Sequence, residues 1–197
     1  ARLDAIYGLP FARRPHPTYD GEVPGFSVIR NSINSHRGCV SGCAFCSLGL
    51  HQGRRIVPRS AGSIMEEVAR LSAAEGFGGH ITDIGGPSAN MYGTVRAADW
   101  RCSRKSCLYP EICPNLRVNT ASWMKLLAGA LASPGVRHAT VGSGIRYDLF
   151  MRDDPSLLND LARDHVSGQL KIAPEHTSTV VLDVMRKKHL YGMEEFA

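Results

Sequence analysis

The amino-acid sequence predicts an α/β fold in which parallel strands alternate with helices and form part of a (β/α) barrel. Two observations support this prediction. Short β-prone segments alternate about four times with segments of helical apolar spacing between residues 26 and 188. The chain of 197 residues is also 43% hydrophobic, which is enough for the core of one domain. We expect this domain to occupy residues 26–197.

The first elements precede and follow a cysteine-rich segment. Residues 1–25 lack a periodic apolar pattern and contain several prolines, so we expect an extended lead-in from a missing upstream region. Residues 26–33 (FSVIRNSI) predict the first strand. Residues 63–74 predict a helix with an apolar face, and Ser63 with Glu66 forms an expected capping box at its start.

The remaining elements continue the alternation of strand and helix. The expected strands are residues 79–84, 138–141 and 169–172. The expected helices are residues 122–131, 155–165 and 179–188. Asp154 before Pro155 is typical of a helix start. Because the sequence stops at MEEFA, where another strand–helix unit should begin, we expect the domain to be truncated at its C-terminal end.

The composition limits the class of protein. No apolar run approaches the roughly 18 residues of a membrane helix, and no secretory signal opens the sequence, so we expect a cytoplasmic protein without a membrane partner. The net charge is +5 and the pI about 9.0. Lys and Arg are scattered in ones and twos, however, so nucleic-acid binding is allowed but not indicated.

Three closely spaced cysteines follow the first predicted strand. Cys39, Cys43 and Cys46 lie in RGCVSGCAFCSLG, where the glycines allow the backbone to wrap tightly around a compact group. Thiolates are good ligands for iron–sulfur clusters and for zinc. Since clusters usually take four protein ligands, three thiolates would leave one iron open to a small molecule. The alternative is zinc held by the three cysteines and His36 or His51.

The segment CVSGCAFC resembles the CxxxCxxC motif of radical S-adenosylmethionine (SAM) enzymes, including an aromatic residue, Phe45, before the third cysteine. Five segments extend the resemblance over nearly the whole chain, to YgiQ-type radical SAM proteins: RGCVSGCAFC, ITDIGGPSANMYG, CSRKSCLYPEICPNL, SGIRYDL and LKIAPEHT. The resemblance implies a 4Fe–4S cluster on the three cysteines, within a radical SAM partial TIM barrel. SAM would chelate the open iron and be cleaved reductively to a 5'-deoxyadenosyl radical.

The resemblance also implies a SAM contact in the loop after the second strand. In DIGGPSAN, Gly85 and Gly86 would let the backbone approach the methionine part of SAM. Pro87 stands where the family usually has Glu, which removes an acidic partner. A tight turn after the strand explains the two glycines equally well.

Two further loops carry charged residues at the expected mouth of the sheet. Arg146 follows the third strand and could bind a carboxylate or ribose, although a surface ion pair with Asp148 explains it nearly as well. Glu175 and His176 follow the fourth strand, in a segment that resembles the one beside the SAM ribose and the substrate. The alternative is a loop that simply caps the next helix.

A second cysteine group lies in a long irregular stretch. Cys102, Cys107 and Cys113 could hold an auxiliary iron–sulfur cluster or a zinc ion, or line the substrate cavity. A structural role in stapling this long loop is slightly favoured over these.

These residues predict a radical SAM enzyme with an unknown substrate and an electron donor such as a flavodoxin or ferredoxin. No catalytic residue is assigned. The alternatives are an iron–sulfur electron carrier without catalytic activity and a zinc-stapled nucleic-acid-binding module.

Overall fold

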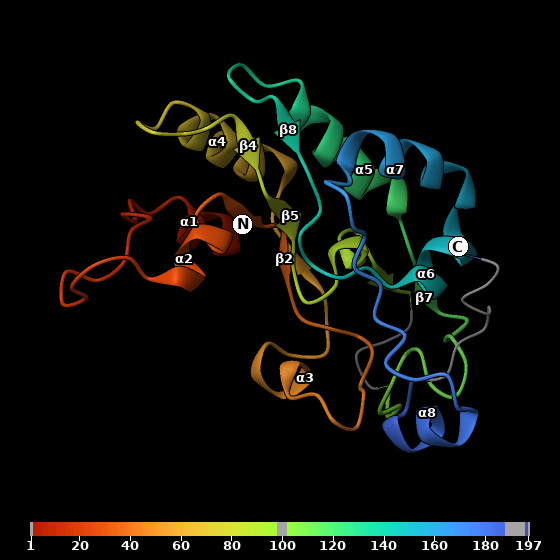
Figure 1. Cartoon of the computed structure of the whole chain (residues 1–197). Coiled ribbons are helices and arrows are strands. Elements are labelled where there is room, and N and C mark those ends of the chain that lie inside the picture. The colour runs from red at the N-terminus through yellow and green to blue at the C-terminus, as the bar shows by residue number, and fades with distance from the viewer. Residues whose placement is uncertain (1, 98–101, 188–195, 197) are drawn as a thin grey trace.

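The computed structural model describes residues 2–97, 102–187 and 196, and it shows a mixed α/β fold (Figure 1). Parallel pairings link strands in chain order. β1 (Ser32–Asn34) pairs with β5 (Asp83–Gly85), and β4 (His80–Ile81) pairs with β8 (His138–Ala139). A single parallel bridge between Ile145 and Ile172 continues the order. The predicted parallel arrangement is thus confirmed, but the described strands form two-stranded sheets and close no barrel.

Helices and short antiparallel pairs complete the fold. The antiparallel pairs are β2 (His36–Arg37) with β3 (Val57–Pro58), and β6 (Val95–Arg96) with β7 (Leu116–Arg117). The α-helices are α1 (Arg2–Tyr7), α2 (Pro24–Ile29), α3 (Leu48–His51), α4 (Ala61–Ser72), α5 (Thr120–Leu131), α6 (Tyr147–Asp153), α7 (Leu158–His165) and α8 (Thr179–Met185). Two 3₁₀ turns are η1 (Ala89–Met91) and η2 (Pro155–Leu157).

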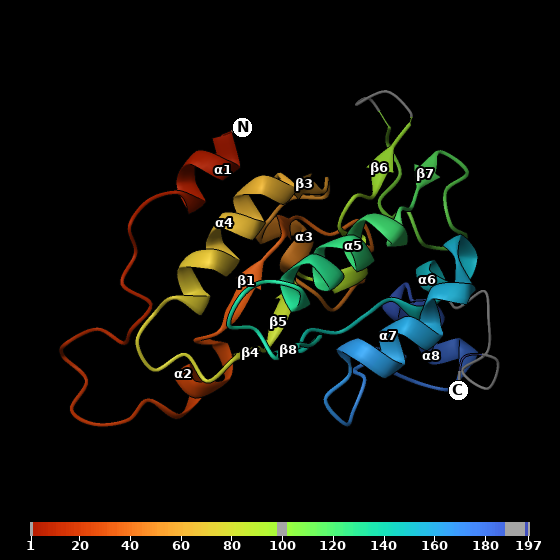
Figure 2. The same ribbon diagram turned by 90° about the horizontal axis from the view of Figure 1, so that it is seen from above.

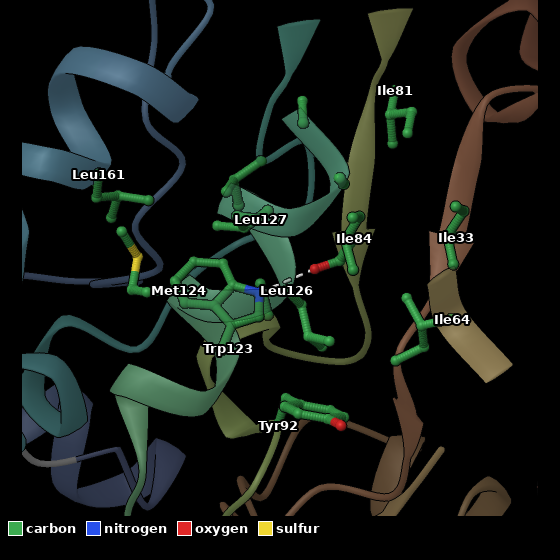
Figure 3. Packing of buried hydrophobic residues seen from close by; sticks show 14 of the residues in the cluster. Ile33, Ile64, Ile81, Ile84, Tyr92, Trp123, Met124, Leu126, Leu127 and Leu161 are labelled. Carbon is green, nitrogen blue, oxygen red and sulfur yellow. Dashed lines mark hydrogen bonds between the residues drawn. The ribbon is translucent and has the colours of Figure 1, made fainter. Parts of the chain in front are cut away.

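The main core lies between the parallel strands and the row of α4, α5 and α7, which lie side by side in Figure 2. Alternate residues of the strands, such as Ile33 and Ile84, point into this core and meet the apolar faces of the helices. Trp123 of α5 is fully buried, and its Nε1 donates a hydrogen bond of 2.9 Å to the carbonyl of Ile84 (Figure 3). This hydrogen bond holds α5 against β5, and the glycine-rich loop follows directly after β5.

The apolar face of α4 agrees with the sequence prediction, but its start does not. Ile64, Val68 and Leu71 are buried as expected. The N-cap is Ser60, whose side chain accepts a hydrogen bond from the backbone N–H of Ser63, so the predicted capping box on Ser63 is wrong. Ser60 precedes Ser63 by the three residues that a side-chain cap requires, so the helix begins at Ala61, two residues before the predicted start.

Two other starts are also capped by side chains, α5 two residues earlier than predicted and η2 at the predicted position. α5 begins at Thr120 and is capped by Asn119, whose side chain accepts from the N–H of Ser122. Asp154 caps the turn that begins at Pro155, as predicted.

Several predicted boundaries are wrong. The strand expected at residues 79–84 is divided into β4 and β5, and the strand expected at 138–141 is limited to β8. Residues 26–29 belong to α2, because Pro24 suits the first turn of a helix, and the first strand is confined to β1. The predicted strand 169–172 makes only the bridge at Ile172. α8 ends at Met185, where Arg186 turns into the left-handed region. The predicted end at Lys188 lies outside the described residues.

The lead-in contains a helix that the sequence did not predict. α1 packs Tyr7 over the guanidinium of the buried Arg59, 4.2 Å from the ring centre. Arg59 and Arg13 both pair with Glu67 of α4. The remainder of the lead-in, residues 8–23, has no regular secondary structure.

None of the described helices is long and apolar enough to cross a membrane.

Leu127→Ala removes a side chain of α5 that is wholly buried in the core. We expect a loss of about 2–5 kcal/mol in the free energy of opening of α4 and α5, from lost burial and the remaining cavity. Hydrogen exchange measured by mass spectrometry on peptides from both helices provides the test. Val184→Ala, at an exposed position of α8, should leave the exchange unchanged. Equal exchange in the two variants would contradict this description of the core.

Candidate functional site

The first cysteine group lies on a loop (residues 38–46, the cysteine loop) that follows β1 and β2. Cys39 is buried, whereas Cys43 and Cys46 are partly exposed. The loop enters past Gly38, which has a φ of +95° and packs so closely that a methyl group there would overlap the carbonyl of Arg55. The N–H of Cys39 donates to the carbonyl of Gly53 at 3.0 Å. One side of the cysteine loop is therefore anchored on the chain that follows α3.

The second cysteine group braces the other side of the same loop. The N–H of Cys107 donates to the carbonyl of Val40 at 3.0 Å, and the hydroxyl of Ser106 donates to the carbonyl of Ser41. A methyl group on Gly42 would overlap the carbonyl of Lys105. We call residues 104–113 the brace segment. Its contacts join two cysteine groups that are far apart in the sequence.

An apolar cluster lies at this junction. Cys39 shares it with Cys107 and Cys113, both buried, and with Leu108 and Met91. Cys113 also donates its N–H to the carbonyl of Cys107 at 2.7 Å. Burial raises the pKa of the Cys107 thiol. These contacts agree with the predicted structural role for the second group; the auxiliary-cluster and zinc alternatives stay untested predictions.

α8 supplies a third support for the cysteine loop. The N–H of Ala44 donates to the carbonyl of Met185 at 2.9 Å, at the end of α8. Lys187, just beyond this helix, is buried and pairs with Glu175 at 2.6 Å. Glu175 has a φ of +68°, a left-handed conformation uncommon for a residue other than glycine. In Figure 1, α3 and α8 lie at the same end of the strands.

The predicted site residue Arg146 is held against the cysteine loop. Its side chain is only 5% exposed, and its guanidinium forms a two-point ion pair with Asp148, with Nε donating to Oδ1 at 2.8 Å. Nη1 reaches the hydroxyl of Ser41 at 3.4 Å. The predicted alternative of a surface ion pair is wrong in one respect, since both partners are buried. The carboxylate of Asp148 therefore already occupies two nitrogens of the guanidinium that the sequence suggested as a binder of a carboxylate or ribose.

Two buried cations act on the thiol of Cys43. Burial raises the pKa of this thiol, and the positive charges of Arg146 and Lys187 oppose the shift. Burial alone would lower the pKa of Arg146, but Asp148 and the neighbouring thiolates outweigh it and raise the pKa. The two cations therefore offset part of the cost of burying negative charge on this thiol, although burial still dominates.

The loop after β5 is hydrogen-bonded to the loop that follows β8. Asn90 exchanges two hydrogen bonds with the backbone of Arg146, at 2.9 Å and 2.8 Å. The N–H of Ala89 donates to the carbonyl of Gly144 at 3.0 Å. The glycine-rich loop, Arg146 and the cysteine loop thus form one continuous network.

Gly85 and Gly86 are required by contacts with protein side chains. A methyl group on Gly85 would overlap the hydroxyl of Ser143, and one on Gly86 would lie 2.6 Å from Cε1 of His36. Asp83, on the same strand, accepts hydrogen bonds from Ser143 and from the N–H of Gly142. Burial raises the pKa of Asp83. The glycines allow close packing at the carboxyl end of β5, and contact with a cofactor stays a prediction.

The described residues bring no three His, Cys, Asp or Glu side chains together around one ion position. His36, named above as a zinc ligand, turns its ring toward Gly86. His51 lies at the end of α3. His176 accepts a hydrogen bond from the N–H of Ser178 and is exposed.

Several residues that shape the site were missed by the sequence analysis. They are Ser41, Asn90, Ser106 and Lys187. Each acts through a contact with a distant segment. Ser41, Asn90 and Ser106 lie within the motifs RGCVSGCAFC, ITDIGGPSANMYG and CSRKSCLYPEICPNL, whereas Lys187 lies outside the quoted motifs.

The fold and site define an α/β protein with a braced three-cysteine loop at the carboxyl end of its first parallel strand. The chain is 47% identical over its whole length to a UPF0313 protein of Methanocella arvoryzae, of which it covers 33%. It is 42% identical, over 98% of its length, to a UPF0313 protein of Bacteroides thetaiotaomicron, and again covers 33%. A UPF0313 protein of Geobacter sulfurreducens is 45% identical, with 32% covered.

The chain therefore spans about a third of the length of the curated relatives it matches. No family model matches this sequence.

Asp148→Ala tests the buried ion pair. Removing one partner leaves the charge of Arg146 buried and unpaired, which we expect to cost about 3–5 kcal/mol. Hydrogen exchange should rise in peptides covering residues 38–46 and 144–153. Arg163→Ala breaks an exposed pair with Asp160 and should change nothing. Exchange at wild-type rates in the Asp148 variant would contradict the role given to this pair.

Gly42→Ala tests the contact between the cysteine loop and the brace segment. The added methyl group meets the carbonyl of Lys105, so exchange should increase in residues 38–46 and 104–113 together. Gly53→Ala is the matched control, because Gly53 also has a positive φ (+92°) but nothing lies within 4 Å of the added group. If exchange increases equally in both variants, the increase is caused by the strain of a positive φ, and the contact with Lys105 is not what holds the two segments together.

Proposed function

We propose that this chain forms the core of a radical SAM enzyme, with a 4Fe–4S cluster bound by Cys39, Cys43 and Cys46. The observation that carries the proposal is the cysteine loop itself. It presents three free thiols at the carboxyl end of a parallel strand and is braced from three sides. In α/β folds with parallel strands, this end is where reactive groups gather.

The residues present fit such a group in their chemistry. Each thiolate of a cluster binds a different iron, so the cysteines need not converge on one point, as they must around a single zinc ion. Three thiolates and a cluster also bring negative charge into a partly buried loop. Arg146 and Lys187 supply positive charge near Cys43. We therefore favour a cluster over zinc.

A cluster held by Cys39, Cys43 and Cys46 would supply the electron for reductive cleavage of SAM to methionine and a 5'-deoxyadenosyl radical. The chain's own task is to hold the cysteines and to keep water away from the site. The brace segment and α8 hold the loop. Arg146, paired with Asp148, positions Ser41 between two of the cysteine ligands.

The remaining residues predicted to contact SAM take roles consistent with this proposal. Gly85 and Gly86 would present backbone to the cofactor beside His36. Glu175 would act by holding Lys187 under the cysteine loop, in addition to any contact with the ribose.

We further propose that residues 26–197 belong to a partial (β/α) barrel whose other strands lie in the longer protein. The order of parallel pairings, from β1 through β5 and β8 to Ile172, supports this proposal. The substrate is unassigned, and the electron donor is proposed to be a flavodoxin or a ferredoxin.

The proposal is tested on the full-length protein after anaerobic reconstitution with iron and sulfide. Reduction in the presence of SAM should yield 5'-deoxyadenosine, measured by mass spectrometry. Cys39→Ala, Cys43→Ala and Cys46→Ala should each lose the cluster and the product. Cys102→Ala is the matched cysteine control and should keep both.

Two results would contradict the proposal. One equivalent of zinc and no iron would indicate the zinc-stapled module. Iron with an electron paramagnetic resonance spectrum that SAM does not change would indicate an electron carrier.

A further inference from the structure

A cavity of about 450 Å³ lies between the brace segment and the end of α8. This volume is within the range of small-molecule sites, about 300–1,000 Å³. The described residues that line it include the cations Arg104, Lys105 and Arg186, the carboxylate of Glu111, and the rings of Tyr109 and Pro110. The cations outnumber the carboxylate, so positive charge is in excess around the cavity.

These cations are not neutralised by carboxylates of the chain. Within the described part of the sequence, none of the three forms an ion pair, and neither does Glu111. The buried cations nearby, Arg146 and Lys187, are by contrast each paired with a carboxylate. Lys105 and Arg186 are also exposed to solvent. The cavity is therefore suited to an anion from outside the chain.

The guanidinium of Arg104 is held in place by its own segment. Its Nε donates to the carbonyl of Ser106 at 3.2 Å, and its Nη2 donates to the carbonyl of Glu111 at 2.8 Å. A guanidinium has more N–H groups than these two bonds use, so others remain to donate to a ligand. Because the side chain is already ordered, it loses less conformational freedom when a ligand binds.

Arg186 extends from a position that favours glycine. It ends α8 with a φ of +53°, a left-handed conformation that is usually taken by glycine at the end of a helix. Its backbone N–H donates to the carbonyl of Asp183 at 3.1 Å, a bond that glycine would form as well. The backbone does not require an arginine here, which directs attention to the side chain that lines the cavity.

The lining indicates the chemical class of the ligand. Arginine and lysine together suit a phosphate group, because one offers a fork of N–H donors and the other a compact charge. Tyr109 is partly exposed, and with Pro110 it adds apolar ring surface to the cavity. Flat rings such as nucleobases stack on aromatic side chains. A nucleotide combines a phosphate with such a ring.

We propose that this cavity binds a small phosphate ester of the nucleotide class, with its phosphate held by Arg104, Lys105 and Arg186. Its ring lies against Tyr109. The brace segment and the end of α8, which border the cavity, are also hydrogen-bonded to the cysteine loop. A bound ligand therefore contacts two of the segments that support this loop. The inference goes beyond the proposed function and does not depend on a bound cluster.

The test measures binding to the full-length protein by isothermal titration calorimetry. The probes are uridine 5'-monophosphate, which has no adenosine that could occupy a SAM site, and uridine, which lacks the phosphate. Lys105→Ala and Arg186→Gly should each weaken binding of the monophosphate about fivefold, because each removes a charged donor to the phosphate. Uridine should bind more weakly than the monophosphate. Lys125→Ala, at an exposed lysine of α5, is the control and should bind normally.

Arg186→Gly separates ligand binding from helix stability. Glycine suits the left-handed position, so hydrogen exchange in peptides from α8 should be no faster than in the wild-type protein. Arg186→Lys keeps the charge and should keep most of the affinity. If Arg186→Gly does speed exchange in α8, the arginine stabilises the helix end, and Lys105→Ala alone decides.

Three results would overturn the proposal. The first is monophosphate affinity within twofold of wild type in the deciding variants. The second is a wild-type protein that binds uridine as tightly as the monophosphate, or binds neither. The third is an oligouridylate strand that binds more than tenfold tighter than the monophosphate, which would indicate RNA as the ligand. Iron content and 5'-deoxyadenosine formation are measured separately, so failure of the proposed function is recognised independently.

Discussion

The conformation of the cysteine loop depends on backbone hydrogen bonds from distant parts of the chain. The loop has no regular secondary structure of its own, and its carbonyls and N–H groups find partners at Gly53, Cys107 and Met185. Buried backbone groups need such partners, so the three supporting segments and the loop stabilise one another. The long irregular stretch around the second cysteine group is explained by this contact.

Two cations near the cysteine loop are each paired with a carboxylate. Arg146 and Lys187 lie near Cys43, and each is paired with a carboxylate, Asp148 or Glu175. The carboxylates keep the buried cations from being unpaired, while the cations still favour negative charge on the loop. This arrangement suits thiolates bound to iron, and it assigns Arg146 to the support of the loop and not to a simple surface ion pair.

Local patterns predicted the elements whose stability is local. The apolar faces of α4 and α5 and the cap at Asp154 were predictable because helical spacing and short-range hydrogen bonds decide them. Residues 26–29 were mispredicted because a short apolar run suits a strand or a helix equally, and Pro24 decides for the helix. The strand expected at residues 169–172 is reduced to one bridge, since pairing depends on a neighbour that the pattern does not describe.

By itself, the sequence determined the α/β class with parallel strands and the close spacing of three thiols, since periodicity and spacing are properties of neighbouring residues. Tertiary structure alone decided that the segment of the second cysteine group braces the first and that Arg146 is buried against Asp148. These features arise from residues brought together by the pairing of β1 with β5 and of β4 with β8. Burial and hydrogen-bond satisfaction are set by such long-range contacts, which spacing along the chain does not encode.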